Sequence, residues 1–135
     1  MAITYDEWEA QVPAEFKQDP LWKMDAYRLA LYLYDLTWDD CAQMRQDPRG
    51  RAIAEQLIRS AGSICANIEE GYGRGFGKQY ALFLGYSLGS TRETRGWYYR
   101  ARKLLTPEIV QQRYNLLTQI TGLIIIALNQ QKGYR

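Results

Sequence analysis

The chain has 135 residues, a length typical of one domain. Its 17 Lys and Arg nearly balance its 15 Asp and Glu, giving a net charge of +2, and 47% of its residues are hydrophobic, which excludes general disorder. The sequence contains no histidine, which excludes Ser-His-Asp and Cys-His catalysis, His-bearing zinc sites and the Glu-x-x-His di-iron sites of ferritin-like bundles. We predict a protein that is not an enzyme and has no catalytic residues, cofactor or metal.

The first 20 residues are predicted to form a short N-terminal arm ahead of the main domain, residues 21–135. Thr4 is followed three residues later by Glu7, the pattern of a capping box, which predicts the start of a short helix. Pro13 and Pro20 bracket a segment that cannot be one continuous regular helix.

Two long helices are predicted next from apolar residues at helical spacing. The first begins near Leu21 and stops at the Pro-containing stretch 46–50, with its apolar positions at Leu21, Met24, Ala26, Tyr27, Leu31, Tyr34 and Trp38. The second ends at the glycine-rich run 71–77, with an apolar stripe at Ile53, Leu57, Ala61, Ile64 and Ile68.

Two further helices complete the domain. One face of the third carries Tyr80, Phe83, Leu84, Ser87, Thr91, Thr94, Tyr98, Ala101 and Leu105. Thr106 and Pro107 are a strong restart signal, with Thr as the N-cap, and the fourth helix runs from there until Gly133. Its apolar face carries Ile109, Leu116, Leu117, Ile120, Leu123, Ile124, Ala127 and Leu128. Because no strand pattern competes, the predicted fold is all-α, an antiparallel up-and-down four-helix bundle with a short N-terminal arm.

The location is expected to be the cytoplasm. The N-terminus lacks the cationic start and long apolar run of a signal peptide. The most apolar stretch, 120–128, is interrupted by Thr121 and Gly122 and is much shorter than the about 20 residues that span a bilayer. No membrane contact is therefore expected. Cys41 and Cys65 fit neither a zinc site nor a Cys-x-x-Cys motif, so both thiols are expected to be reduced.

A stripe of polar side chains runs beside the apolar stripe of the second helix. Its members are spaced four and three residues apart: Gln56, Ser60, Ser63, Asn67, Glu70 and Arg74. One interpretation is a solvated face. The other is a second packed face, where small side chains allow close approach of another helix and Asn67 fixes the register by demanding a partner.

The glycine-rich segment from Gly71 to Lys78 resembles a phosphate-binding loop only superficially. The phosphate-loop pattern requires a glycine where Tyr72 stands and a hydroxyl where Gln79 stands, and no strand precedes the segment. We predict a helix–helix turn rather than a nucleotide site.

A candidate nucleic-acid-binding face lies on the third helix, where five residues fall within about 100° of one another at 3.6 residues per turn. They are Arg92, Arg95, Tyr99, Arg102 and Lys103. Four cations and a tyrosine suit a surface that follows phosphates and stacks on a base. The alternative is a solvated face paired with the arm, because residues 1–47 carry a net charge of −6 and residues 48–135 a net charge of +8.

Aromatic and apolar residues point to a homo-oligomer. Trp97, Tyr98 and Tyr99 face three directions, so they cannot share one core, and the apolar stretch 123–128 surrounds its helix. Tyrosine and tryptophan are enriched at protein interfaces. Assembly into a ring would repeat a basic patch and increase its avidity.

The second and third helices carry recognisable motifs. The stretch 55–74, with its Asn-Ile-x-Glu-Gly core and Gly-x-Arg, resembles the signature of the 23S rRNA intervening-sequence four-helix bundle family, although Glu69 stands where that family usually has alanine. Further similarity extends over about residues 22–128. The motif residues that the resemblance assigns to structural or interface roles are Ser60, Ser63, Asn67, Glu70, Gly71, Arg74, Gly89, Ser90 and Glu93.

The resemblance implies a bundle that assembles into a barrel-like pentamer, encoded within ribosomal RNA genes. A similar protein, the accessory variability determinant of diversity-generating retroelements, binds nucleic acid and a reverse transcriptase through a basic surface. The leading hypothesis is therefore a non-enzymatic homo-oligomer, a pentamer by the family resemblance, that binds RNA, DNA or a nucleic-acid-processing partner such as a reverse transcriptase. The alternative is a protein-interaction or structural scaffold module. A metal-dependent hydrolase built on Asp39 and Asp40 has little support.

Overall fold

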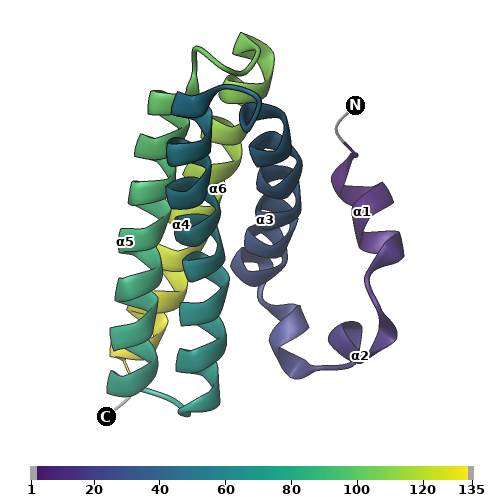
Figure 1. Cartoon of the computed structure of the whole chain (residues 1–135). Helices are drawn as coiled ribbons and strands as arrows, with labels where there is room; N and C mark the ends of the chain where they lie inside the picture. Colours follow the sequence, from purple (N-terminus) through teal and green to yellow (C-terminus); the bar gives the residue numbers. More distant parts are fainter. Residues whose placement is uncertain (1–2, 134–135) are drawn as a thin grey trace.

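The computed structural model describes residues 3–133 and contains helices and turns, with no strand in that range. Four long helices form the main body: α3 (Asp25–Met44), α4 (Pro48–Gly73), α5 (Lys78–Ala101) and α6 (Pro107–Lys132). Figure 1 shows the four side by side, with the chain running up α3, down α4, up α5 and down α6. The predicted antiparallel four-helix bundle is confirmed. Within the described residues, no helix is long and apolar enough to cross a membrane.

Side-chain caps start two of the long helices. The carboxylate of Asp47 accepts a hydrogen bond from the backbone N–H of Arg49 at 2.8 Å, and Pro48 occupies the first helical position of α4. Hydrogen bonds from the side chain and backbone of Arg49 lower the pKa of Asp47 to about 2. At the start of α6 the hydroxyl of Thr106 accepts from the N–H of Ile109 at 3.2 Å, so the predicted restart signal is confirmed.

The core follows the predicted stripes of α4, α5 and α6 closely, with Leu57, Ile64, Leu84 and Ile120 fully buried. The predicted stripe of α3 was wrong at its end, because the side chain of Trp38 is 62% exposed. Apolar residues occur on several faces of α3, which makes its inward face ambiguous from periodicity alone. The buried residues of α3 are Ala26, Tyr27, Ala30, Tyr32, Leu33, Leu36, Thr37, Asp40, Cys41 and Met44.

The N-terminal arm contains two short helices, α1 (Tyr5–Gln11) and α2 (Ala14–Lys17), and the 3-10 helix η1 (Pro20–Lys23) connects the arm to α3. The capping box is confirmed, since the N–H of Glu7 donates to the hydroxyl of Thr4 and the N–H of Thr4 donates to the carboxylate of Glu7. Because η1 occupies residues 20–23, the first long helix begins at Asp25 and not near Leu21.

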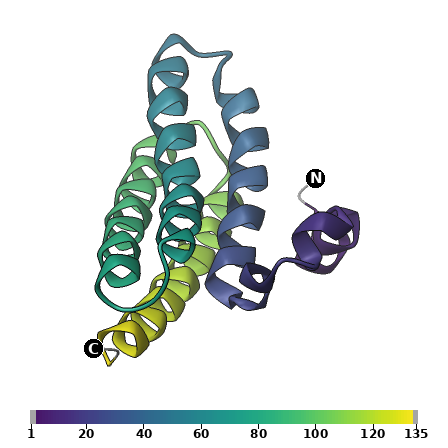
Figure 2. The same ribbon diagram turned by 90° about the horizontal axis from the view of Figure 1, so that it is seen from below.

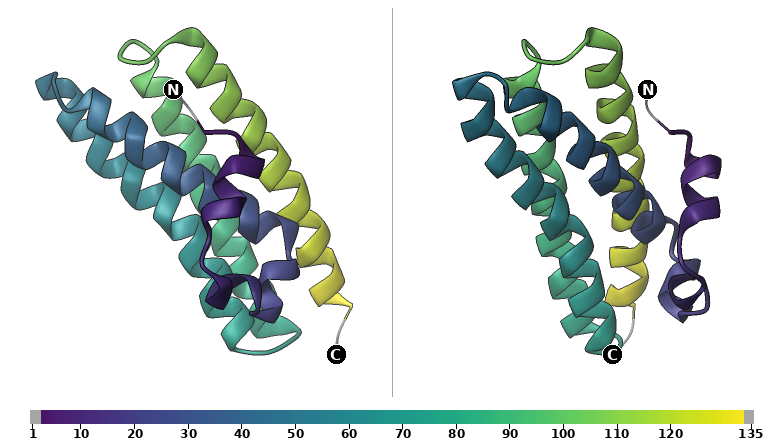
Figure 3. Two further views of the ribbon diagram at one scale, coloured as in Figure 1. Left: turned by 90° about the vertical axis from the view of Figure 1, so that its right-hand side faces the viewer. Right: turned by 45° about the vertical axis from the view of Figure 1, so that its right-hand side comes forward.

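Aromatic contacts attach the arm to α3. The side chain of Trp8 is buried, and its indole N–H donates to the carboxylate of Asp35 at 2.7 Å. The hydroxyl of Tyr32 donates to the carbonyl of Ile3 at 2.6 Å. Figures 2 and 3 show the arm lying against the α3 side of the bundle, away from α5. The acidic residues of the arm are therefore remote from the basic residues of α5 in the same chain.

Candidate nucleic-acid interface

Hydroxyl groups line the contact between α4 and α5. The hydroxyl of Thr94 donates to that of the buried Ser60 at 3.0 Å, and the hydroxyl of Ser90 donates to that of Ser63 at 3.0 Å. The hydroxyl of Ser87 donates to a backbone carbonyl of α4 at 2.9 Å. Small side chains bring the two backbones close together, and each hydroxyl finds a partner there. For Ser60 and Ser63, the interpretation as a second packed face is therefore the right one.

The remaining polar side chains of the stripe form their hydrogen bonds and ion pairs within α4. The amide of Asn67 donates to the carbonyl of Ser63 at 2.9 Å, so this asparagine finds its partner in its own helix instead of on a neighbour. Glu70 and Arg74 form an exposed ion pair at 2.8 Å, one turn apart. The stripe thus packs along its first half and is solvated along its second half.

Two other motif residues hold α4 against α5. The carboxylate of Glu93 accepts from the indole N–H of Trp97 at 3.0 Å and from the guanidinium of Arg59 on α4. The same two hydrogen bonds lower the pKa of Glu93. A Cβ atom at Gly71 would lie only 2.7 Å from the Cβ of Phe83, so a glycine is required where the helices approach. Gly89, in contrast, is exposed, with open space around it.

Only the second part of the glycine-rich run forms the predicted turn between α4 and α5, because α4 continues to Gly73. Gly75 and Gly77 have φ angles of 95° and 82°, in the region that favours glycine. The N–H of Gly77 donates to the buried side-chain carbonyl of Gln131 at 3.0 Å, which ties the turn to the end of α6. No motif in the sequence had indicated a role for Gln131.

The five predicted binding residues are all exposed on the α5 side of the bundle. Arg92, Arg95 and Tyr99 belong to α5, but that helix ends at Ala101, so Arg102 and Lys103 lie in the following turn rather than on the helix. The guanidinium carbon of Arg102 lies 4.0 Å from the ring centroid of Tyr99. We refer to these residues as the basic surface: Arg92, Arg95, Tyr99, Arg102 and Lys103.

The cations of the basic surface have no acidic partner among the ion pairs of residues 3–133. The structure contradicts the alternative, in which the acidic arm of the same chain pairs with these cations, because the arm lies against α3 (Figure 1). Arg100, absent from the prediction, is also exposed and stacks on Trp97, with 4.6 Å between its guanidinium carbon and the ring centroid.

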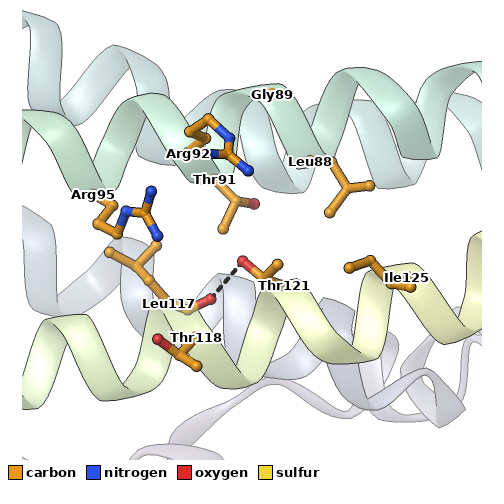
Figure 4. Close-up of a pocket in the computed structure, with 9 residues that line it drawn as sticks. All are labelled: Leu88, Gly89, Thr91, Arg92, Arg95, Leu117, Thr118, Thr121 and Ile125. Atoms are coloured by element: carbon orange, nitrogen blue, oxygen red, sulfur yellow. Dashed lines mark hydrogen bonds between the residues drawn. The ribbon is translucent and has the colours of Figure 1, made fainter.

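Two recesses follow the seam between α5 and α6. The first has a volume of about 250 Å³, and Figure 4 shows Arg92, Thr91 and Leu88 of α5 facing Thr118, Thr121 and Ile125 of α6 across it. The second is an open hollow of about 450 Å³, which we call the tyrosine recess; it is lined by Arg95, Gly96, Tyr99, Arg100 and Tyr114. Arg95 lines both recesses, so they are neighbours along the seam.

Asp39 and Asp40, the paired acids considered for a hydrolase, lie in different environments. Asp39 is exposed, whereas Asp40 is buried and accepts two hydrogen bonds from Arg113, at 2.8 and 3.0 Å. The hydroxyl of Tyr98 also donates to Asp40, at 2.6 Å, and accepts from Thr37 at 2.8 Å. Burial and the charge of Asp40 raise the pKa of Tyr98 well above its usual value. Asp40 is therefore occupied in a network that joins α3, α5 and α6.

Other reactive side chains are equally enclosed. Burial raises the pKa of Cys41 to about 11 and also raises the pKa of Cys65, so both thiols are protonated at neutral pH. Across residues 3–133, no group of three or more Cys, Asp or Glu side chains is placed to hold a metal ion.

Residues 21–125 match the sequence model of the family described as 23S rRNA-intervening sequence protein. The fold is similar to the crystal structure of a protein with unknown function from the S23 ribosomal protein family of Bacteroides thetaiotaomicron, with a TM-score of 0.71. The two sequences are 21% identical, and the similarity covers 76% of this chain and 97% of that chain. No curated protein matches this chain. The family match confirms the resemblance that the motif residues indicate, and it leaves the N-terminal arm outside the shared region.

Proposed function

This chain belongs to the 23S rRNA-intervening sequence protein family, and from that premise we propose that it is a non-enzymatic, cytoplasmic homo-oligomer that binds nucleic acid through the basic surface. One observation carries the proposal: four cations and a tyrosine are exposed together at one end of α5, with no acid of the described chain neutralising them. Nucleic-acid phosphates are the partner that such a surface suits, because each contact releases condensed counterions.

Exposed apolar side chains on the same side of the bundle support assembly. Leu82 and Tyr86 near the start of α5 are 47% and 51% exposed, and Ile125 and Ile126 near the end of α6 are 43% and 57% exposed. Because α5 and α6 are antiparallel, these four residues lie toward the same end of the bundle, and Ile125 also lines the first recess with Arg92 and Arg95. Large exposed apolar side chains favour an interface between subunits. An oligomer formed there repeats the basic surface in every subunit, and the family resemblance favours five copies.

Salt titration and charge reversal test the nucleic-acid proposal. The purified protein is expected to bind labelled RNA or DNA with an affinity that falls as salt rises, by a log–log slope of about −0.7 to −0.9 per phosphate contact. Reversing Arg92, Arg95, Arg102 and Lys103 to Glu is expected to abolish binding. Fluorescence anisotropy measures both effects, and light scattering with absorbance at 260 and 280 nm reports assembly size and co-purifying nucleic acid.

A matched variant controls for net charge. Lys17, Lys23, Arg45 and Arg51 are exposed, take part in none of the ion pairs of residues 3–133, and lie outside the basic surface. Reversing these four changes the net charge by the same amount and is expected to preserve most of the binding. Salt-independent binding, or equal loss in both variants, would contradict the proposal. Capture of one protein with no nucleic acid would favour a scaffold, and capture of a reverse transcriptase would identify a processing partner.

A further inference from the structure

The tyrosine recess adds a second kind of chemistry to the basic surface. Tyr99 on α5 is 56% exposed, and Tyr114 on α6 lines the recess with it. The guanidinium of Arg102 covers one face of the Tyr99 ring at 4.0 Å, and Arg95 and Arg100 stand at the walls. Two aromatic rings among arginines provide both a stacking platform and charge for an anion.

Gly96 keeps the recess open. A Cβ atom at this position would lie 3.1 Å from Nη1 of Arg100, whose guanidinium stacks on Trp97. A larger side chain would therefore displace the end of Arg100 or occupy part of the recess that Gly96 lines. The glycine leaves a hollow of about 450 Å³, open to solvent.

The first recess continues the same path along the seam. Tyr114, Thr118 and Thr121 are spaced by four and three residues, so they share the face of α6 that borders α5. At 1.5 Å per residue, the stretch from Tyr114 to Thr121 is about 10 Å long. Arg92 and Arg95 border it from α5 (Figure 4), so cations and hydroxyls extend beyond the tyrosines in one direction.

We propose that the tyrosine recess takes an unpaired base of a single-stranded nucleic acid, whose backbone continues past Arg95 and Arg92 along the α5–α6 seam. The inference rests on the function proposed above and specifies its substrate class. In a duplex the base faces are stacked inside the helix, so exposed tyrosine rings have no base to contact. A single strand offers both a free base for the recess and phosphates for the arginines.

Three probes of equal length separate base binding from phosphate binding: a dodecamer of deoxythymidine, its duplex with deoxyadenosine, and a dodecamer of abasic sites with the same backbone. We expect the thymidine strand to bind about tenfold more tightly than the abasic strand. Tyr99→Leu together with Tyr114→Leu is expected to remove that difference, so that the thymidine strand binds no more tightly than the abasic strand. Anisotropy at constant salt measures all three affinities.

Two further variants distinguish stacking from a change in fold. Tyr99→Phe retains the ring and is expected to retain the preference for the thymidine strand. Tyr72→Leu removes another exposed tyrosine, on α4 and outside the recess, and is expected to retain that preference as well. Light scattering on every variant checks that assembly is unchanged.

The outcomes separate the two proposals. Equal binding of thymidine and abasic strands, or a preference that survives the double leucine variant, overturns the base-binding inference while salt-dependent binding to the basic surface still stands. Tighter binding of the duplex overturns it too. Failure of every probe to bind, with no binding of labelled RNA either, overturns the proposed function itself.

Discussion

At the scale of single residues, the most constrained group in the molecule is the carboxylate of Asp40. Its side chain and that of Arg113 are 4% and 3% exposed, and both oxygens of Asp40 accept hydrogen bonds from that guanidinium. A buried ion pair adds little stability compared with apolar residues of similar volume, but loss of one partner leaves a charge without compensation. The pair therefore selects one arrangement of α3 against α6 more than it strengthens the core.

Removing one partner of this ion pair is expected to lower the free energy of unfolding more than removing both. Arg113→Met leaves Asp40 charged and buried, and should lower the free energy of unfolding by about 3–5 kcal/mol. Asp40→Leu combined with Arg113→Met should lower the free energy of unfolding less than Arg113→Met alone, because no buried charge remains. Urea denaturation followed by circular dichroism measures both values. Additive losses in the double variant would show that the two side chains are not coupled.

The position of Asp40 was visible in the sequence, although its role was not recognised. It lies seven residues after Leu33 and four after Leu36, on the inward face of α3. An acid at such a position needs a buried cation or hydroxyl. Only the packing of the helices reveals that Arg113 and Tyr98, 73 and 58 residues later, supply them.

At the scale of elements, α4 packs most extensively against α5, and two glycines of this helix pair have different surroundings. Gly71 has no room for a Cβ atom, since Phe83 and Tyr80 lie within 2.7 and 3.0 Å of where that atom would be. Gly85 lies in the interior of α5 with open space around it. A helical glycine without a neighbour costs stability because its backbone loses more freedom on folding than that of alanine.

Alanine at these two positions should therefore have opposite effects. Gly71→Ala is expected to lower stability by about 1–3 kcal/mol through overpacking. Gly85→Ala is expected to raise the stability of the folded subunit by about 0.5–1 kcal/mol. Thermal denaturation of both variants at one protein concentration gives the comparison. A stabilised Gly71→Ala variant would mean that the contact with Phe83 relaxes without cost.

Element boundaries were predictable where a local interaction sets them. Thr4, Asp47 and Thr106 each accept a backbone hydrogen bond at a helix start, and such caps act within three residues. The end of α5 was placed too late, because the apolar spacing continues to Leu105 while the helical hydrogen bonds stop at Ala101. The side chain of Leu105 is buried all the same, from the turn.

At the scale of the whole molecule, charge is separated across the bundle. The acidic arm contacts α3, and the basic surface lies on α5 and the turn after it (Figures 1 and 3). The near-neutral total of +2 therefore conceals two sides of opposite sign. Such an arrangement directs a polyanion to one side of the subunit.

The arm should detach without unfolding the bundle. Trp8 is its buried anchor, in contact with Trp22 and hydrogen-bonded to Asp35. Trp8→Ala is expected to accelerate tryptic cleavage after Lys17 by about tenfold or more, while α3 to α6 retain their helical signal. Limited proteolysis with mass spectrometry and circular dichroism tests both parts. Cooperative loss of all helical signal would show that the arm is integral to the core.

Periodicity and caps were enough to predict the four long helices, their order and the core faces of α4 to α6, because these signals act within a few turns of the chain. Composition was enough to exclude histidine chemistry. The packing of the helices was needed to show which polar groups are buried together, where the arm lies, and that Arg95, Tyr99 and Tyr114 border one recess. Contacts between residues far apart in sequence depend on how helix faces pack, and no local pattern specifies that packing.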